Sequence, residues 1–101
     1  MARVIVSLLA QADAAYIVTD LAGKAGQSVA AKYAASFEAL YERLGAHPDS
    51  GAPRPVLGPQ VRIGIVSPYI VIHEHIKADD AVTILRIVHG HRKITRRLLR
   101  R

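Results

Sequence analysis

The chain has 101 residues, of which 50% are hydrophobic and none is cysteine. This length supports one compact domain over residues 1–101 with a modest core, and the missing cysteines exclude a disulfide framework and a cysteine-based zinc site. The formal net charge is +6, and the stretch from His89 to Arg101 is basic without a single acidic residue. Such a surface attracts nucleic acid or an acidic protein segment.

The beginning of the chain predicts a strand. Its β-branched run indicates a strand over Arg3–Leu9. Gln11 and Asp13 follow where a signal peptide would continue its apolar core, and no stretch of about 18 apolar residues suits a membrane span. We therefore expect a cytoplasmic protein without a membrane partner.

Two helices are expected next. From Ala10, apolar residues recur at spacings of three and four until glycines at positions 23 and 26 interrupt the pattern. A second helix is predicted to begin at Gln27 or Ser28 and to be stopped by Gly45 and Pro48. Its apolar stripe consists of Ala30, Tyr33, Ala34, Phe37, Leu40, Tyr41 and Leu44. Because the connection is short, the helices should form an antiparallel hairpin.

A loop and three strands complete the predicted fold. The segment His47–Gln60 is rich in proline and glycine, as loops are. Alternating β-formers predict the strands Val61–Val66, Tyr69–Ile76 and Ala81–His89, with turns at 67–68 and 77–80. The order is β-α-α-β-β-β. This predicts an α+β fold with the helical hairpin packed on one face of a small, mainly antiparallel sheet, and a basic tail that forms a short last helix.

The strand register follows from the assumption that Ile76 lies opposite Ala81. The opposed pairs are then Ile72 with Leu85, Ile70 with Ile87, Val71 with Arg86 and His73 with Ile84. Pairing Ile65 with Ile70 places Arg62 opposite His73. One face then carries Ile63, Ile65, Ile70, Ile72, Leu85 and Ile87, and we expect the hairpin to cover it. The other face, with Arg62, Tyr69, His73 and Arg86, is expected to stay open to a partner.

Several of these segments resemble a known family. The run Val82–Ile94 (VTILRIVHGHRKI), preceded by Asp79–Asp80, by Tyr69–Ile72 and by Leu57–Gly58, is similar to the ParE branch of the RelE/ParE toxins, also called plasmid stabilisation proteins. The predicted second helix fits the family as well, from Tyr33, Phe37 and Leu40 to His47–Pro48. The similarity covers nearly the whole chain and is strongest in the segment Leu85–Arg92.

The resemblance implies a growth-inhibiting toxin of a type II toxin–antitoxin pair. Its partner would be a ParD-like antitoxin whose acidic tail wraps the toxin in a hetero-oligomer. Toxins of the ParE branch are associated with inhibition of DNA gyrase, whereas the RelE branch cleaves mRNA on the ribosome. Cleavage needs groups that exchange protons and cations that neutralise the phosphate. Here the tail after Gly90 has no tyrosine, and the middle strands lack a lysine cluster, which favours a gyrase inhibitor that is not an enzyme.

The two mechanisms assign roles to an overlapping set of residues. The catalytic candidates of a ribonuclease are Arg62, His73, Arg86 and His91. The candidates for binding the target or the antitoxin are Arg62, Tyr69, Arg86, His89, Arg92, Lys93, Arg96 and Arg97. For Arg62 and Arg86 two further interpretations stay open: guanidinium groups that receive antitoxin carboxylates, or structural ion pairs with Glu74, Asp79 or Asp80.

No metal or other cofactor is predicted. His73 and His75, and likewise His89 and His91, have an i, i+2 spacing, but the two pairs would lie roughly 17 Å apart along the strand, too far to share a metal ion. A third functional class is a basic adaptor that binds nucleic acid without toxicity. Tyr69 is the one aromatic residue on the expected open face, which disfavours binding of single strands by base stacking.

Overall fold

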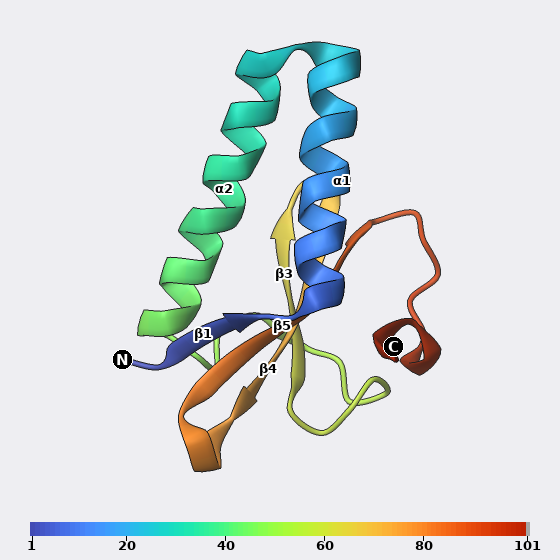
Figure 1. Ribbon diagram of the computed structural model, residues 1–101. Coiled ribbons are helices and arrows are strands. Elements are labelled where there is room, and N and C mark those ends of the chain that lie inside the picture. Colours follow the sequence, from blue (N-terminus) through green and yellow to red (C-terminus); the bar gives the residue numbers. More distant parts are fainter. Residues whose placement is uncertain (101) are drawn as a thin grey trace.

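A helical hairpin stands on a five-stranded sheet in the computed structural model, which describes residues 1–100 (Figure 1). The helices are α1 (Leu8–Ala25) and α2 (Gln27–Ala46). The strands are β1 (Arg3–Val6), β2 (Ala52–Pro53), β3 (Val61–Val66), β4 (Tyr69–Ile76) and β5 (Ala81–His89). Two short 3-10 helices, η1 (Lys77–Asp79) and η2 (Arg96–Leu99), follow β4 and β5. The predicted α+β order and the short last helix are confirmed, and β2 is an additional strand inside the predicted loop.

The first strand is shorter than predicted because a polar residue starts the helix early. Ser7 is the N-cap of α1, and its hydroxyl oxygen accepts a hydrogen bond from the N–H of Ala10 at 3.1 Å. The helix then continues through Gly23 and ends at Gly26, whose φ of 96° suits glycine. The chain reverses there, and α1 and α2 form the predicted antiparallel hairpin (Figure 1).

The sheet has the strand order β1-β5-β4-β3-β2, with β1 parallel to β5 and the other pairs antiparallel. The predicted pairing of Arg62 with His73 and of Ile65 with Ile70 is confirmed. Between β4 and β5 the register holds from Ile76–Ala81 to His73–Ile84. Beyond that point the prediction is wrong by one residue, because an irregularity leaves Ile72 opposite Arg86.

The helices cover the face that was predicted to be open. Their core contains Ile17, Phe37, Leu40 and Leu44 from the hairpin and Val71, Val82, Ile84 and Ile87 from the sheet, with Tyr69 packed against it. The fully buried His73 has the same strand parity as Tyr69 and Val71. The sheet is apolar on both faces, so alternation alone did not reveal which side the helices cover. The extra residue in β5 also made the predicted faces wrong, because it places Ile87 on the same face as Ile84, under the helices.

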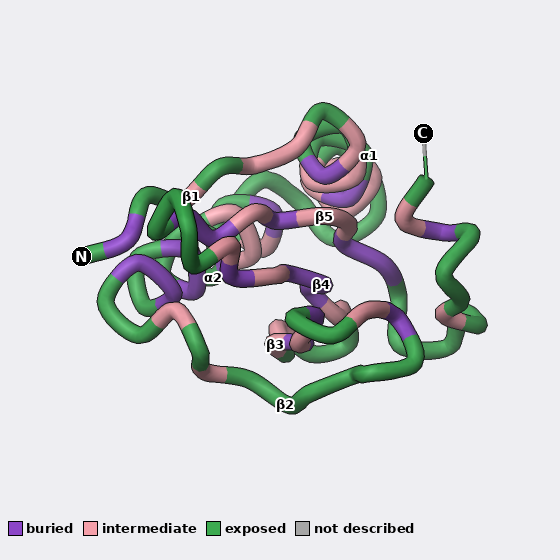
Figure 2. Tube along the Cα trace, turned by 90° about the horizontal axis from the view of Figure 1, so that it is seen from below, coloured by how far each residue is buried: buried purple, intermediate pink, exposed green. Residues whose placement is uncertain are grey.

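The opposite face is covered by loop and tail. A second core joins Val61, Ile63, Ile72 and Val88 of the sheet to Leu57 of the loop and Leu98 of η2. Ile70, Leu85, Ile94 and Leu99 pack around it. In Figure 2, α1 and the loop that carries β2 lie on opposite sides of β5 and β4. Of the predicted aliphatic face, Ile63 and Ile72 are buried here, with Ile70 and Leu85 packed against them, under the loop and the tail instead of the hairpin. Ile65 is 58% exposed, and Ile87 lies in the core under the helices.

Candidate functional site

Arg86 is held in place by two other parts of the chain. Its Nε and Nη2 donate to the two carboxylate oxygens of Asp13 in α1, at 2.7 and 2.9 Å, and its Nη1 donates to the carbonyl oxygen of Leu98 at 2.8 Å. Only 15% of the Arg86 side chain and 16% of the Asp13 side chain are exposed. The bond to Asp13 raises the pKa of Arg86 further. Arg86 therefore ties α1, β5 and the tail together.

The ion pair at Arg86 corrects two expectations. Arg86 does not lie on an open sheet face, and its acidic partner is Asp13 instead of Glu74, Asp79 or Asp80. β1 pairs with β5 only as far as Ile84, and α1 covers the exposed strand edge beyond it. There Asp13 also accepts a hydrogen bond from the backbone N–H of Ile87 at 2.9 Å. The sequence predicted only that this helix packs through its apolar stripe. In the structure its polar side also binds the edge of β5, through Asp13.

His73 is buried, which contradicts its expected place on an open face. None of its surface is exposed, and neither ring nitrogen has a hydrogen-bond partner among the described residues. Burial, and next the charge of Arg62, lowers its pKa from 6.5 to about 4. The ring is therefore neutral at pH 7. Arg62 itself is half-buried, and its Nη1 donates to the carbonyl oxygen of Gly51 at 2.9 Å.

Three predicted binding residues do meet, beside α1. Tyr69, His89 and Arg92 line one surface hollow together with Asp13, Tyr16 and Asp20 of α1. The ring of Tyr69 contacts His89 edge-on, with centroids 5.8 Å apart, and His89 stacks on His91 at 4.8 Å. Burial raises the pKa of the Tyr69 hydroxyl. Tyr16, which was not predicted to bind, is 72% exposed at this hollow.

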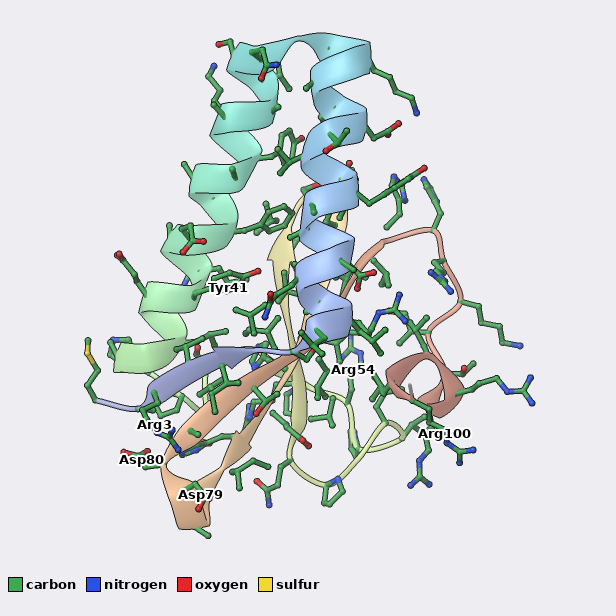
Figure 3. All side chains as sticks on the ribbon, in the orientation of Figure 1. Arg3, Tyr41, Arg54, Asp79, Asp80 and Arg100 are labelled. Carbon is green, nitrogen blue, oxygen red and sulfur yellow. The ribbon has the colours of Figure 1, made fainter. Side chains whose placement is uncertain are left out.

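The basic tail is ordered by apolar anchors and presents its cations to solvent. Leu98 is buried in the second core, whereas Lys93, Arg96 and Arg97 are exposed. Figure 3 shows the η2 segment, with Arg100 labelled at its end, beside the loop and away from α2. The tail is therefore a fixed basic surface next to the hollow of Tyr69 and Arg92.

A further polar cluster was missed in the sequence. The two ring nitrogens of His75 lie 2.9 Å from Asp49 Oδ1 and 3.2 Å from Asp80 Oδ1. Hydrogen bonding to Asp49 first, and to Asp80, raises the pKa of His75, and the same bond lowers the pKa of Asp49. Asp80 shapes the turn before β5 in the left-handed conformation, as predicted for a turn residue, and lies near Arg3 (Figure 3). In the sequence, the pair Asp79–Asp80 was the one indication of this cluster, and it was interpreted only as part of a turn.

Residues 1–100 contain no group of three or more histidine, aspartate or glutamate side chains placed to hold a metal ion. Within the same range, no helix is long and apolar enough to cross a membrane.

Comparison with known proteins shows that the chain is similar to one family of toxins. Residues 4–94 match the family described as ParE toxin of type II toxin-antitoxin system, parDE. A solved structure described as the chromosomal ParDE TA system from P. aeruginosa is similar, with a TM-score of 0.72 and 24% sequence identity. The match covers 88% of this chain and 96% of that chain. A search of curated proteins found no match.

Proposed function

Because the chain belongs to the ParE toxin family of type II toxin–antitoxin systems, we propose that it inhibits DNA gyrase by direct binding and is neutralised by a ParD-like antitoxin. The proposed activity is in the cytoplasm, and the proposed contact surface is the hollow of Tyr69, His89 and Arg92 with the basic tail. No bond in a substrate needs to be broken for this function, so the toxin is not an enzyme in this proposal.

The observation that carries this proposal is that the four ribonuclease candidates do not form one accessible site, since only Arg62 and His73 lie opposite each other and His73 is buried. Arg86 is engaged by Asp13 and Leu98, so its guanidinium is not free to hold a phosphate. His73 is buried and neutral, while His91 is exposed on another part of the molecule. Acid–base cleavage needs these groups within hydrogen-bond reach of one phosphate. The burial of His73 and the internal hydrogen bonds of Arg86 therefore support binding over cleavage.

Two observations support an antitoxin partner. The similar solved structure is described as a ParDE system, which names a toxin with its antitoxin. The net charge of +6 favours association with an acidic chain. Antitoxin neutralisation is expected to reverse growth inhibition when both genes are expressed together.

A supercoiling assay with purified gyrase tests the mechanism. Increasing toxin should reduce supercoiling of relaxed plasmid, and addition of the antitoxin should restore it. Arg92→Ala with Arg96→Ala should weaken inhibition, whereas Arg3→Ala, which removes an exposed cation on β1, should not. Undiminished supercoiling at toxin excess contradicts the proposal.

The alternative function, a ribosome-dependent mRNA endoribonuclease, has one observation in its favour. His91 and Arg92 are exposed next to each other beside the His89 ring, and an imidazole with a guanidinium could act on a phosphodiester. Primer extension on cellular mRNA after induction distinguishes the two functions. New cuts in translated frames, lost in His91→Ala, would favour the ribonuclease.

A further inference from the structure

The tail presents a group of cations that have no acidic partner. They are Arg92, Lys93, Arg96, Arg97 and Arg100, and we call them the tail cations. All five are exposed, and none of them forms a salt bridge within residues 1–100. The sequence after Gly90 contains no aspartate or glutamate that would neutralise them. Their charge is therefore available to an anion outside the chain.

The backbone that carries the tail cations is held in place. Leu98 is buried in the second core, and Ile94 and Leu99 pack against that core. The carbonyl oxygen of Leu98 accepts a hydrogen bond from Arg86 Nη1 at 2.8 Å. Within Arg96–Arg100 the two leucines are thus covered, while the arginines on either side of them are exposed. Because this segment is already ordered, less conformational entropy is lost when an anion binds to it.

The acidic residues near the tail do not cancel its charge. Asp13 and Asp20 line the hollow together with Arg92, but Asp13 binds Arg86, and Asp20 lies 3.2 Å from Lys24. The turn between β4 and β5, which carries two further aspartates, lies on the other side of the molecule from η2 (Figure 3). The tail is therefore a positively charged region without compensation from the acids that line the neighbouring hollow.

The chemistry of this surface suits a phosphodiester backbone. Among residues 1–100, none of the exposed large hydrophobic side chains belongs to the tail, so the apolar anchor typical of protein interfaces is missing. Residues 92–101 include no aromatic side chain on which unpaired bases would stack. Arginine and lysine bind phosphate oxygens, and duplex DNA carries one negative charge per about 1.7 Å of its axis. These features favour a duplex over a single strand or an acidic protein segment.

We propose that the tail cations bind the phosphate backbone of duplex DNA, so that the toxin contacts DNA as well as the enzyme that acts on it. This deepens the proposed function, on which its role in the cell rests. The hollow of Tyr69, His89 and Arg92 meets gyrase, and the tail meets the DNA that gyrase holds. Contacts to phosphates carry no sequence information, so binding should not depend on the base sequence.

Fluorescence anisotropy with the full-length protein and a labelled duplex of about 20 base pairs tests the DNA contact. The logarithm of the Kd should rise linearly with the logarithm of the salt concentration, with a slope of about 0.9 for each phosphate neutralised. Arg96→Gln with Arg97→Gln and Arg100→Gln should raise the Kd at least about 10-fold at about 100 mM salt and lower the slope by about 2–3.

A charge-matched control separates the tail surface from the net charge of the protein. Arg3→Gln with Lys32→Gln and Arg43→Gln also removes three exposed cations, from β1 and α2. This variant should change the Kd by less than about 3-fold. Equal losses in the two triple variants, or a Kd of the wild type above about 100 µM at about 50 mM salt, overturn the proposal. Tighter binding of the single strand, or of polyglutamate, overturns the choice of duplex DNA.

Gyrase with and without DNA distinguishes this contact from the proposed function. The tail variant should lose affinity for gyrase that carries DNA by a larger factor than for gyrase alone. Equal factors would assign the tail to the enzyme and overturn the DNA contact, while the proposed inhibition of gyrase stands. A wild-type toxin that binds the duplex but not gyrase contradicts the proposed function and leaves the DNA contact in place.

Discussion

Asp13 and Arg86 are 73 residues apart in the sequence and share two hydrogen bonds of 2.7 and 2.9 Å between carboxylate and guanidinium. The third bond of Arg86, to the Leu98 carbonyl oxygen, extends this pair to the tail. Arg86, which the sequence suggested as a binding residue, therefore connects α1, β5 and the tail.

Breaking the pair should destabilise the fold. Arg86→Ala or Asp13→Ala is expected to lower the free energy of unfolding by about 2–4 kcal/mol, because the remaining partner stays partly buried without its counter-charge. Urea denaturation measures the change. The double variant should lose less than the sum of the two single losses. Asp20→Ala, which removes an exposed pair with Lys24, should cost no more than about 0.5 kcal/mol. A loss at Arg86 as small as at Asp20 would contradict this structural role.

Stability should depend on the protonation of His75. Its pKa is raised in the folded state by Asp49 and Asp80, so the folded protein holds the proton more tightly than the unfolded chain. The resulting stabilisation is complete below the unfolded pKa near 6.5 and is lost as pH rises through the higher folded pKa. Thermal melting between pH 5 and 9 should show a decline that His75→Gln removes and that His89→Gln, an exposed control, retains.

His73 should act in the opposite direction. Because burial lowers its pKa to about 4, the unfolded chain takes up a proton between pH 6.5 and that value while the folded protein does not. Stability should therefore fall as pH decreases through this window. His73→Leu should remove this acid-side decline and raise the free energy of unfolding at pH 7 by roughly 1–2 kcal/mol, since it replaces unpaired polar atoms.

The His73→Leu variant also separates the two toxic mechanisms. If the toxin does not use His73 as a proton donor, growth inhibition by His73→Leu should equal that of the wild type in an induction assay at matched protein levels. If His73→Leu is folded and stable but no longer toxic, His73 takes part in the toxic function.

Two glycines should respond oppositely to alanine. At Gly51 a Cβ would lie 2.6 Å from the carbonyl oxygen of Ile63, and φ is 97°, so Gly51→Ala should destabilise by about 1–3 kcal/mol. At Gly23, inside α1, nothing lies within 4 Å of an added Cβ. Gly23→Ala should stabilise by about 0.5–1 kcal/mol. Calorimetric melting of both variants checks this contrast, and equal shifts of one sign would refute it.

The residue pattern by itself determined the elements and most of their pairing. Periods of two and of about 3.6 are local properties, so the three C-terminal strands, the hairpin and the Arg62–His73 pairing followed from the chain alone. Resemblance in the segment Leu85–Arg92 identified the family.

Only the tertiary structure decided which face of the sheet the helices cover and what each polar residue contacts. Both faces are apolar, so the choice depends on how the long-range pieces fit: room for Leu40 above Gly64, and the extra residue near Arg86 that changes the parity of β5. Asp13 with Arg86, and Asp49 with His75, meet across long stretches of chain, and no local pattern encodes such contacts. Periodicity fixes which side chains share a face, whereas packing fixes what that face meets.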